Sequence, residues 1–307
     1  MSNNLLFEGI VDVEIDYVPA LAISNVGKVS ISGAQEKIFA VKDSNTYRLA
    51  HEGEQSTYII KPRPNNPALM NQSEMPQNEY LTMQIAAKVY GIKTADVGIV
   101  RLKNRQLAYI VKRFDITDSG KLFQEDICSL LGRSAQTHGG DYKYKGSYVE
   151  IAEVLKNTLQ TWRFEMPKFF ALVIFNYLFA NGDAHMKNFS VIRNLNGEYR
   201  LTPAYDLLNT SLHINDTDFA LEGGLGLDIK ETSEVFDSTN HPCAHDFRVF
   251  GRKCGLTEKQ IDKTLELFCS KQTEVYDLCE SSLLSKKCKR MYIRSYEERL
   301  ARLNKRN

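Results

Sequence analysis

Residues 169–188 read FFALVIFNYLFANGDAHMKN and join the most apolar segment of the chain to its densest group of polar side chains. In the first twelve of them Asn176 alone interrupts the apolar run. The helix expected over 167–180 is therefore apolar on nearly every face, which is typical of a helix at the centre of a lobe. A loop that leaves a buried helix is held firmly at its root, so we expect the polar residues 181–188 to be positioned well enough for catalysis.

The regions on either side of this segment differ in pattern. Before residue 114, short runs rich in Ile, Val, Phe and Tyr predict strands at 37–42, 58–61 and 107–112. A single helix is expected between Pro76, which suits a first turn, and Gly91, which suits the residue after a helix end.

After residue 114, the sequence predicts helices at 147–160 and 257–269 and a charged helical tail from 270 to 307. Asn194–Gly197 predicts the turn of a hairpin between 189–193 and 198–201. Strands followed by helices predict an α+β fold of two lobes, with a sheet-rich part at 1–114 and a helical part at 115–307.

Composition excludes several classes of protein. The 307 residues carry 39 Lys and Arg against 38 Asp and Glu, which argues against a nucleic-acid coat, an acidic chaperone or a disordered tail. We expect no direct nucleic-acid binding, and the longest apolar run is too short to span a bilayer. Six cysteines without a C-x-x-C pair indicate reduced thiols in a cytoplasmic protein, and the first residues lack the pattern of a signal peptide.

The polar loop has the spacing of a phosphotransferase. Asp183 and Asn188 are five residues apart, as in protein kinases, where the Asp accepts a hydroxyl proton and the Asn holds Mg²⁺. Asp206 follows the predicted hairpin and would supply a second oxygen ligand, since Mg²⁺ takes few protein ligands and completes its shell with phosphate and water.

Further candidate parts of an ATP site precede the loop in the expected order. Residues 28–37 form a small-residue loop suited to phosphate, and Lys61 ends a short strand, where its charge would meet the α- and β-phosphates. Glu79 lies eighteen residues later on the expected helix, where it would pair with Lys61. Residues 111–114 would offer backbone groups to adenine, with Phe114 on its ring. Each part alone is common, and the joint order is what indicates a kinase.

These motifs resemble those of the HipA kinases, the toxins of bacterial toxin–antitoxin systems. The resemblance rests on Ser30–Lys37 (SISGAQEK), Ile60–Pro62, Asn78–Tyr80, Arg113–Asp115, Asp183–Ser190 (DAHMKNFS) and Ala204–Asp206. It implies a bilobal protein-kinase-like fold and a serine/threonine kinase that uses ATP and Mg²⁺, whose protein substrates include aminoacyl-tRNA synthetases. It also implies autophosphorylation at Ser30 and Ser32. The implied ATP-binding residues are Ser32, Gly33, Ala34, Gln35, Glu36, Lys37, Lys61, Lys112, Arg113, Phe114, His185, Lys187, Asn188, Tyr205 and Asp206.

Two features depart from the HipA pattern. The phosphate loop begins near residue 28, whereas ordinary HipA chains carry a longer preceding segment. The chain therefore resembles the short HipT type, whose partners are a small HipS-like protein and a DNA-binding HipB-like antitoxin. Lys112 stands where HipA kinases usually have Glu, so a backbone contact with adenine would be kept, but no side-chain role is carried over to Lys112.

Other interpretations of the same residues stay open. Asp183, Asn188 and Asp206 would also suit turns, and Lys61 and Glu79 would also suit a solvated surface. A pseudokinase-like binding module is one alternative function, and a small-molecule or lipid kinase is another. Residues 241–245 read HPCAH, but this spacing matches no standard zinc site. The nine basic residues within 286–306 indicate a solvated helix.

Overall fold

The computed structural model describes residues 4–17 and 35–307. Ser30, Ser32, Gly33 and Ala34, which the sequence assigns to the phosphate loop, lie outside the described residues. The chain forms two compact units, and each unit draws on three stretches of sequence. The first unit comprises residues 1–118, 207–216 and 273–293, and the second comprises 119–206, 217–272 and 294–307. The division into lobes at residue 114 stays a prediction.

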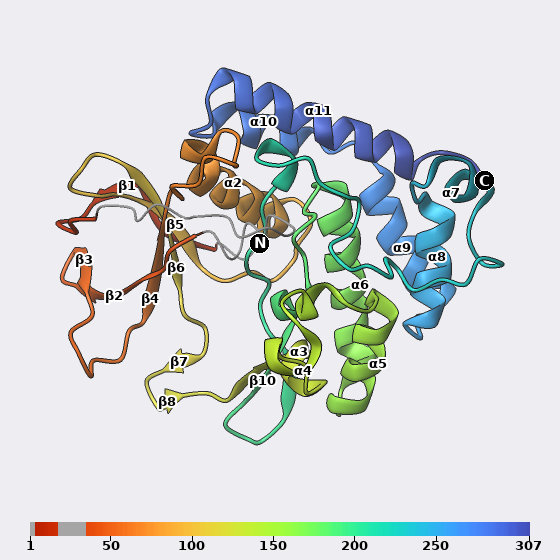
Figure 1. Cartoon of the computed structure of the whole chain (residues 1–307), viewed down its shortest axis with the longest axis horizontal. Coiled ribbons are helices and arrows are strands. Elements are labelled where there is room, and N and C mark those ends of the chain that lie inside the picture. Colours follow the sequence, from red (N-terminus) through yellow and green to blue (C-terminus); the bar gives the residue numbers. More distant parts are fainter. Residues whose placement is uncertain (1–3, 18–34) are drawn as a thin grey trace. The chain divides into compact units, whose positions relative to one another are not determined.

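The first unit is built on a six-stranded sheet of order β1-β5-β6-β4-β2-β3 (Figure 1). Strand β1 runs parallel to β5, and the other neighbours are antiparallel. The elements of this unit are β1 (Leu5–Asp12), β2 (Ile38–Asp43), β3 (Thr46–Leu49), β4 (Tyr58–Pro62), η1 (Gln72–Glu74), α2 (Met75–Lys88), β5 (Val97–Arg101), β6 (Leu107–Lys112), β7 (Ile116–Thr117), η4 (Thr210–Leu212), α10 (Thr273–Ser281) and the first part of α11 (Lys286–Leu303).

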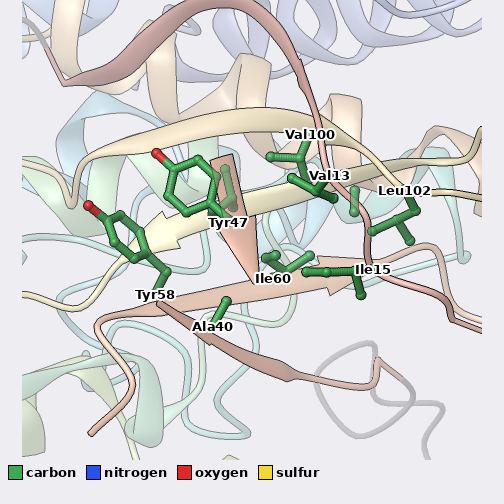
Figure 2. Packing of buried hydrophobic residues seen from close by; sticks show 10 residues of the cluster. Val13, Ile15, Ala40, Tyr47, Tyr58, Ile60, Val100 and Leu102 are labelled. Carbon is green, nitrogen blue, oxygen red and sulfur yellow. The ribbon is translucent and has the colours of Figure 1, made fainter. Parts of the chain in front are cut away.

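One face of this sheet carries a hydrophobic cluster, which Figure 2 shows from close by. Ala40, Ile60 and Ile110 are fully buried in it, and they come from three adjacent strands. Successive residues of a strand face opposite sides, so alternate positions of β2, β4 and β6 reach the same cluster. The burial of these side chains fixes the register of β4, and therefore the place of Lys61 at its end.

Helix α2 packs against β5 and β6 of the sheet, and α10 packs against α2. Helix α2 has a proline in its first turn, and Gly91 beyond its end has a φ of +63°. Proline tolerates the first turn because its missing N–H has no intrahelical partner there, and glycine adopts a left-handed conformation without a Cβ clash. This helix carries Glu79.

The second unit is mainly helical, and α6 packs against both α5 and α9 (Figure 1). The elements are β8 (Gly120–Lys121), β9 (Gln124–Asp126), α3 (Ile127–Leu130), α4 (Ala135–His138), η2 (Tyr142–Tyr144), α5 (Tyr148–Thr158), α6 (Trp162–Leu178), η3 (Met186–Asn188), β10 (Ser190–Arg193), β11 (Tyr199–Leu201), α7 (Glu234–Thr239), α8 (Ala244–Lys253), α9 (Glu258–Cys269) and the last part of α11. Phe169, Phe170 and Phe175 of α6 are fully buried, as its apolar character predicts.

The structure refines several predicted boundaries. Helix α6 begins at Trp162, because a first turn closes before Pro167, with Phe164 N–H donating to Thr161 O. The charged tail forms two helices, α10 and α11. The predicted hairpin is confirmed, since β10 pairs antiparallel with β11. Among the described residues, no helix combines the length and apolar character that crossing a bilayer requires.

Candidate active site

The loop that carries Asp183 is anchored where helix α6 ends. Ala180 adopts a left-handed φ of +48°, and Asn181 N–H then donates to Asn176 O at 2.8 Å. This is the hydrogen bond that closes a helix end in a Schellman motif, here with Ala in the position that glycine usually takes. The Asn181 side chain adds a bond to Asn176 Oδ1 at 2.8 Å, so the root of the loop is held twice.

The loop is wrapped tightly around the backbone of Asp183. The Asp183 carbonyl accepts the N–H of His185 at 2.8 Å and Nδ2 of Asn188 at 3.0 Å. Tyr148 Oη donates to the next carbonyl, Ala184 O, at 2.9 Å. The five-residue spacing of Asp183 and Asn188 therefore has a structural consequence, because Asn188 reaches back across one turn of η3.

The carboxylate of Asp183 is buried, with 6% of the residue exposed, and it receives a hydrogen bond from a distant tyrosine. Tyr144 Oη donates to Asp183 Oδ1 at 2.6 Å. Tyr144 lies in η2 and is itself 2% exposed. Tyr144 was not predicted as a site residue, because its partner is 39 positions away and no local pattern marks it.

Asn188 and Asp206 offer oxygen atoms of the kind that Mg²⁺ prefers. Nδ2 of Asn188 faces the Asp183 carbonyl, and this orientation presents Oδ1 as a ligand atom. Asp206 has a φ of +55°, a strained conformation for a residue with a Cβ. Its backbone oxygen accepts Asn181 Nδ2 at 3.3 Å, so the loop of Asp183 also holds the backbone of Asp206. An amide and one carboxylate fit a hard cation that keeps water and phosphate oxygens.

In the parts of the chain that the structure describes, no group of three or more His, Cys, Asp or Glu side chains is placed to hold a metal ion. His241 instead pairs with Asp218 through Nδ1 at 2.8 Å.

His185 is buried at the centre of the loop as a neutral ring. It is 1% exposed, and neither ring nitrogen has a hydrogen-bond partner among the described residues. Burial, together with the charge of Lys143, lowers its pKa to about 3, although the charge of Asp206 acts in the opposite direction. Its ring lies edge-on to Tyr144, with 5.3 Å between centroids. A neutral buried imidazole is a poor proton shuttle at neutral pH. One of its nitrogens is able to donate a hydrogen bond to a polar ligand and the other to accept one.

Lys187 and Tyr205, both expected to contact ATP, bind protein groups. Lys187 Nζ lies 2.6 Å from Asp126 Oδ2 at the end of β9. Tyr205 Oη donates to the Lys187 carbonyl at 2.9 Å and lies 2.5 Å from Ser190 Oγ. These bonds fix the segment before Asp206 against the loop, which gives both residues a structural role in this geometry.

The first unit contains a buried ion pair. Lys61 Nζ, at the end of β4, lies 2.7 Å from Glu79 Oε1 on α2. The two residues are 5% and 2% exposed, and Lys61 Nζ also lies 5.4 Å from the centre of the Tyr109 ring. The ion pair expected from the sequence is thus present. A partner of opposite charge is required here, because an uncompensated buried ammonium is strongly unfavourable.

The remaining ATP candidates of the first unit differ in what they offer. Gln35 Nε2 donates to Pro62 O at 3.1 Å, one residue beyond Lys61. Glu36 and Lys37 are exposed, and Glu36 accepts a hydrogen bond from Tyr17.

At the predicted adenine strand, the N–H groups of Lys112 and Arg113 already donate to Asp96 O and Thr57 O, both at 2.9 Å. The Arg113 guanidinium binds Asp115 through two nitrogens. Adenine would therefore have to use other backbone groups here, such as carbonyls, and Phe114 is half-buried.

A polar network in the same unit was not expected from the sequence. Asn78, next to Glu79, donates to Asn209 O at 2.8 Å and accepts Asn209 N–H at 3.1 Å. Its Nδ2 also lies 2.8 Å from His213 Nε2, while Nδ1 of His213 lies 3.0 Å from Met70 O. The neutral tautomer with the proton on Nδ1 satisfies both contacts. The helix of Glu79 is thereby tied to the segment that begins just after Asp206.

The sequence model of the HipA-like C-terminal domain family matches residues 29–295, which is most of the chain and includes the candidate residues of each unit. The chain belongs to the HipA-like C-terminal domain family. The resemblance seen in its motifs is confirmed at this level.

Two relatives that carry kinase names are similar to the chain. A Haemophilus influenzae protein named "Putative kinase" is 26% identical over 295 residues, which cover 90% of this chain and 82% of the relative. The serine/threonine-protein kinase toxin HipA of Shewanella oneidensis is 26% identical over 206 residues, which cover 61% of this chain but only 44% of that toxin.

Solved structures confirm the kinase-like α+β fold. The HipA chain in the Shewanella oneidensis complex of HipA, HipB and operator DNA gives a TM-score of 0.69 at 20% identity, covering 91% of this chain and 65% of that one. The Helicobacter pylori proinflammatory kinase CtkA gives a TM-score of 0.54 at 14% identity, covering 87% of this chain and 94% of that one.

Proposed function

We propose that the chain is an ATP- and Mg²⁺-dependent serine/threonine protein kinase that acts as the toxin of a bacterial toxin–antitoxin system. The observation that carries this proposal is the loop of the second unit, where Asp183 is buried with its carboxylate held by Tyr144 and Asn188 presents an amide oxygen. The kinase names of the relatives support it.

In the proposed reaction, a serine or threonine hydroxyl gives its proton to Asp183 while its oxygen forms a bond to the γ-phosphorus. The bond from that phosphorus to the bridging oxygen breaks, and ADP leaves with the electron pair. Lys61, held by Glu79, neutralises charge on the phosphates. Mg²⁺, when held by Asn188 and Asp206, would neutralise further phosphate charge. Positioning and charge neutralisation supply most of the acceleration in such reactions.

The finer assignments follow from the motif resemblance. We assign the chain to the HipT type, with a HipS-like protein and a HipB-like antitoxin as partners, in the bacterial cytoplasm. The Shewanella HipA structure contains HipB, which supports an antitoxin partner of this class. An aminoacyl-tRNA synthetase is the proposed target, and Ser30 and Ser32 are the proposed sites of autophosphorylation. Phosphate there would repel ATP and lower activity.

Transfer of label from γ-³²P-ATP to the proteins of a bacterial lysate tests the proposal. The variant Asp183→Asn should lower transfer about 10²- to 10⁴-fold, the usual contribution of a general base, and should leave ATP binding nearly unchanged. Asp228→Asn is the matched control, because this aspartate of the second unit is 84% exposed at its side chain. Mass spectrometry of the incubated chain locates any phosphate on Ser30 or Ser32.

Three results would contradict the proposal. Undiminished transfer by purified Asp183→Asn would exclude Asp183 as the general base of the proposed reaction. ATP binding without labelling of any molecule would favour the pseudokinase alternative. Label that enters only lipids or small molecules would favour the alternative of a small-molecule or lipid kinase.

A further inference from the structure

We propose that Tyr144 is a positioning residue that orients the carboxylate of Asp183 for proton transfer. This inference rests on the proposed function, because it assigns a role in the same phosphoryl transfer. It concerns a residue that lies outside the motifs shared with the HipA kinases, in the segment between α4 and α5.

Hydrogen bonds on Asp183 act on two different parts of the residue, its main chain and its carboxylate. His185 N–H and Asn188 Nδ2 donate to its backbone carbonyl, so they fix the main chain. Tyr144 Oη donates to the carboxylate itself, at 2.6 Å from Oδ1. This distance is in the range of charge-assisted O–H···O⁻ bonds, which are about 2.5–2.7 Å long. The terminal torsion of an aspartate is otherwise broad, so a bond to one oxygen determines where the other points.

Tyr144 is itself held in place. Its N–H donates to Asp141 O at 2.9 Å, and its carbonyl accepts Glu222 N–H at 2.9 Å. The ring is edge-on to His185 at 5.3 Å, and Lys143 Nζ lies 5.1 Å from the ring centre. With 2% of the residue exposed, the hydroxyl has little freedom to leave Asp183. A rigid donor of this kind is what a general base requires if its oxygen is to meet a substrate hydroxyl in one geometry.

The bond does not use up the carboxylate. An ionised aspartate has two oxygens and about four lone-pair positions, and the bond from Tyr144 to Oδ1 takes only one of these positions. In the transfer step, the proton passes from the substrate oxygen to Asp183 as that oxygen bonds to the γ-phosphorus and ADP departs. Tyr144 keeps its own proton throughout, which separates a positioning role from an acid–base role.

The test compares two tyrosines that support the same loop. Tyr144→Phe removes the hydroxyl on the carboxylate but keeps the ring against His185. Tyr148→Phe is the matched control, because it removes an equally buried hydroxyl whose acceptor is the Ala184 carbonyl, at 2.9 Å. Rates of label transfer from γ-³²P-ATP are measured against ATP concentration, with whichever polypeptide the wild-type chain labels as acceptor, itself included.

We expect Tyr144→Phe to lower the maximal rate about tenfold, which corresponds to about 1.4 kcal/mol. The half-saturating ATP concentration should stay within about twofold of the wild type, and the melting temperature should match that of Tyr148→Phe. Tyr148→Phe should lower the rate much less. In an Asp183→Asn background, Tyr144→Phe should have little further effect, because the group through which it acts is gone.

Several outcomes would overturn this inference without touching the proposed function, provided that the wild type transfers phosphate and that Asp183→Asn transfers it far more slowly but measurably. They are an unchanged rate in Tyr144→Phe, an equal loss in Tyr148→Phe, or a full further loss in the Asp183→Asn background. A faster rate in Tyr144→Phe would also overturn it, because the phenol would then be competing with the substrate hydroxyl for the base. Failure of the wild type to transfer phosphate to any acceptor would reject both proposals together.

Discussion

The ion pair of Lys61 and Glu79 leads to a quantitative prediction about stability. Nζ and Oε1 are 2.7 Å apart, and both side chains are almost completely buried. Glu79→Gln keeps the size of the side chain and removes its charge, so Lys61 loses the carboxylate that lies 2.7 Å from its ammonium. The double variant Lys61→Met, Glu79→Leu removes both charges and fills the space with apolar atoms.

The two variants should differ because charges are costly to bury. Each ion loses several kcal/mol of hydration, and their mutual attraction offsets this only while both are present. Breaking a buried pair from one side costs about 3–5 kcal/mol, whereas replacing both partners by apolar residues is often neutral or stabilising. At about 2–4 °C per kcal/mol, Glu79→Gln should melt roughly 10 °C lower, with the double variant close to the wild type.

Urea unfolding followed by circular dichroism measures both free energies, and differential scanning fluorimetry gives the melting temperatures. Both variants should lose phosphoryl transfer, because one removes Lys61, the group proposed to hold the ATP phosphates, and the other removes the carboxylate that holds Lys61. Equal destabilisation of the two variants, or a cost below about 1 kcal/mol for Glu79→Gln, would show that water reaches Lys61 and that the pair is not desolvated as the structure shows.

Three further predictions concern pH, a glycine and the thiols. Burial lowers the pKa of His213 from 6.5. Below pH 6.5 the unfolded chain therefore takes up a proton at this histidine that the folded chain does not, so the free energy of unfolding decreases as the pH is lowered. In urea unfolding, His213→Gln should remove up to about 1.4 kcal/mol of this decrease per pH unit. An unchanged dependence of the free energy of unfolding on pH would contradict this. Gly146→Ala should lower the melting temperature more than Gly139→Ala. Both glycines have positive φ (+98° and +81°), but only at Gly146 would an added Cβ overlap Glu150. Equal melting temperatures of the two variants would show that Glu150 moves aside. A thiol reagent should modify Cys269 first, because the other five cysteines are buried. All six thiols should react after denaturation. Rapid modification of several thiols in the native chain would argue against this burial.

The elements that the sequence predicted well are those specified by neighbouring residues. Helix α6 and the β10–β11 hairpin follow from an unbroken apolar run and from a turn whose residues are consecutive. The helix that ends before Gly91 follows from its flanking Pro and Gly. Such signals are local, so they survive without knowledge of the tertiary fold.

Strands β1 and β5 show where local signals fail. Neither was predicted, and they pair in parallel although more than 80 residues separate them. Gly9 interrupts β1 and has a φ of +74°, and the register of the pair shifts between Leu5 and Ile10. A strand whose alternation is broken in this way depends on its partner for stability, and the partner cannot be read from the strand itself.

The site divides along the same line. The chemistry of Asp183 and Asn188 and their spacing are properties of one short segment, so the amino-acid sequence was enough to name them as candidates. The Lys61–Glu79 pair was predicted from the order of several kinase-like parts along the chain. Three other features depend on residues that folding brings together. They are the hydrogen bond from Tyr144 to Asp183 Oδ1, the hydrogen bonds between Asn78 and Asn209, and the neutral state of His185. Local patterns encode backbone propensity and residue type, whereas orientation and protonation depend on the dielectric surroundings and neighbours that only packing of the chain creates.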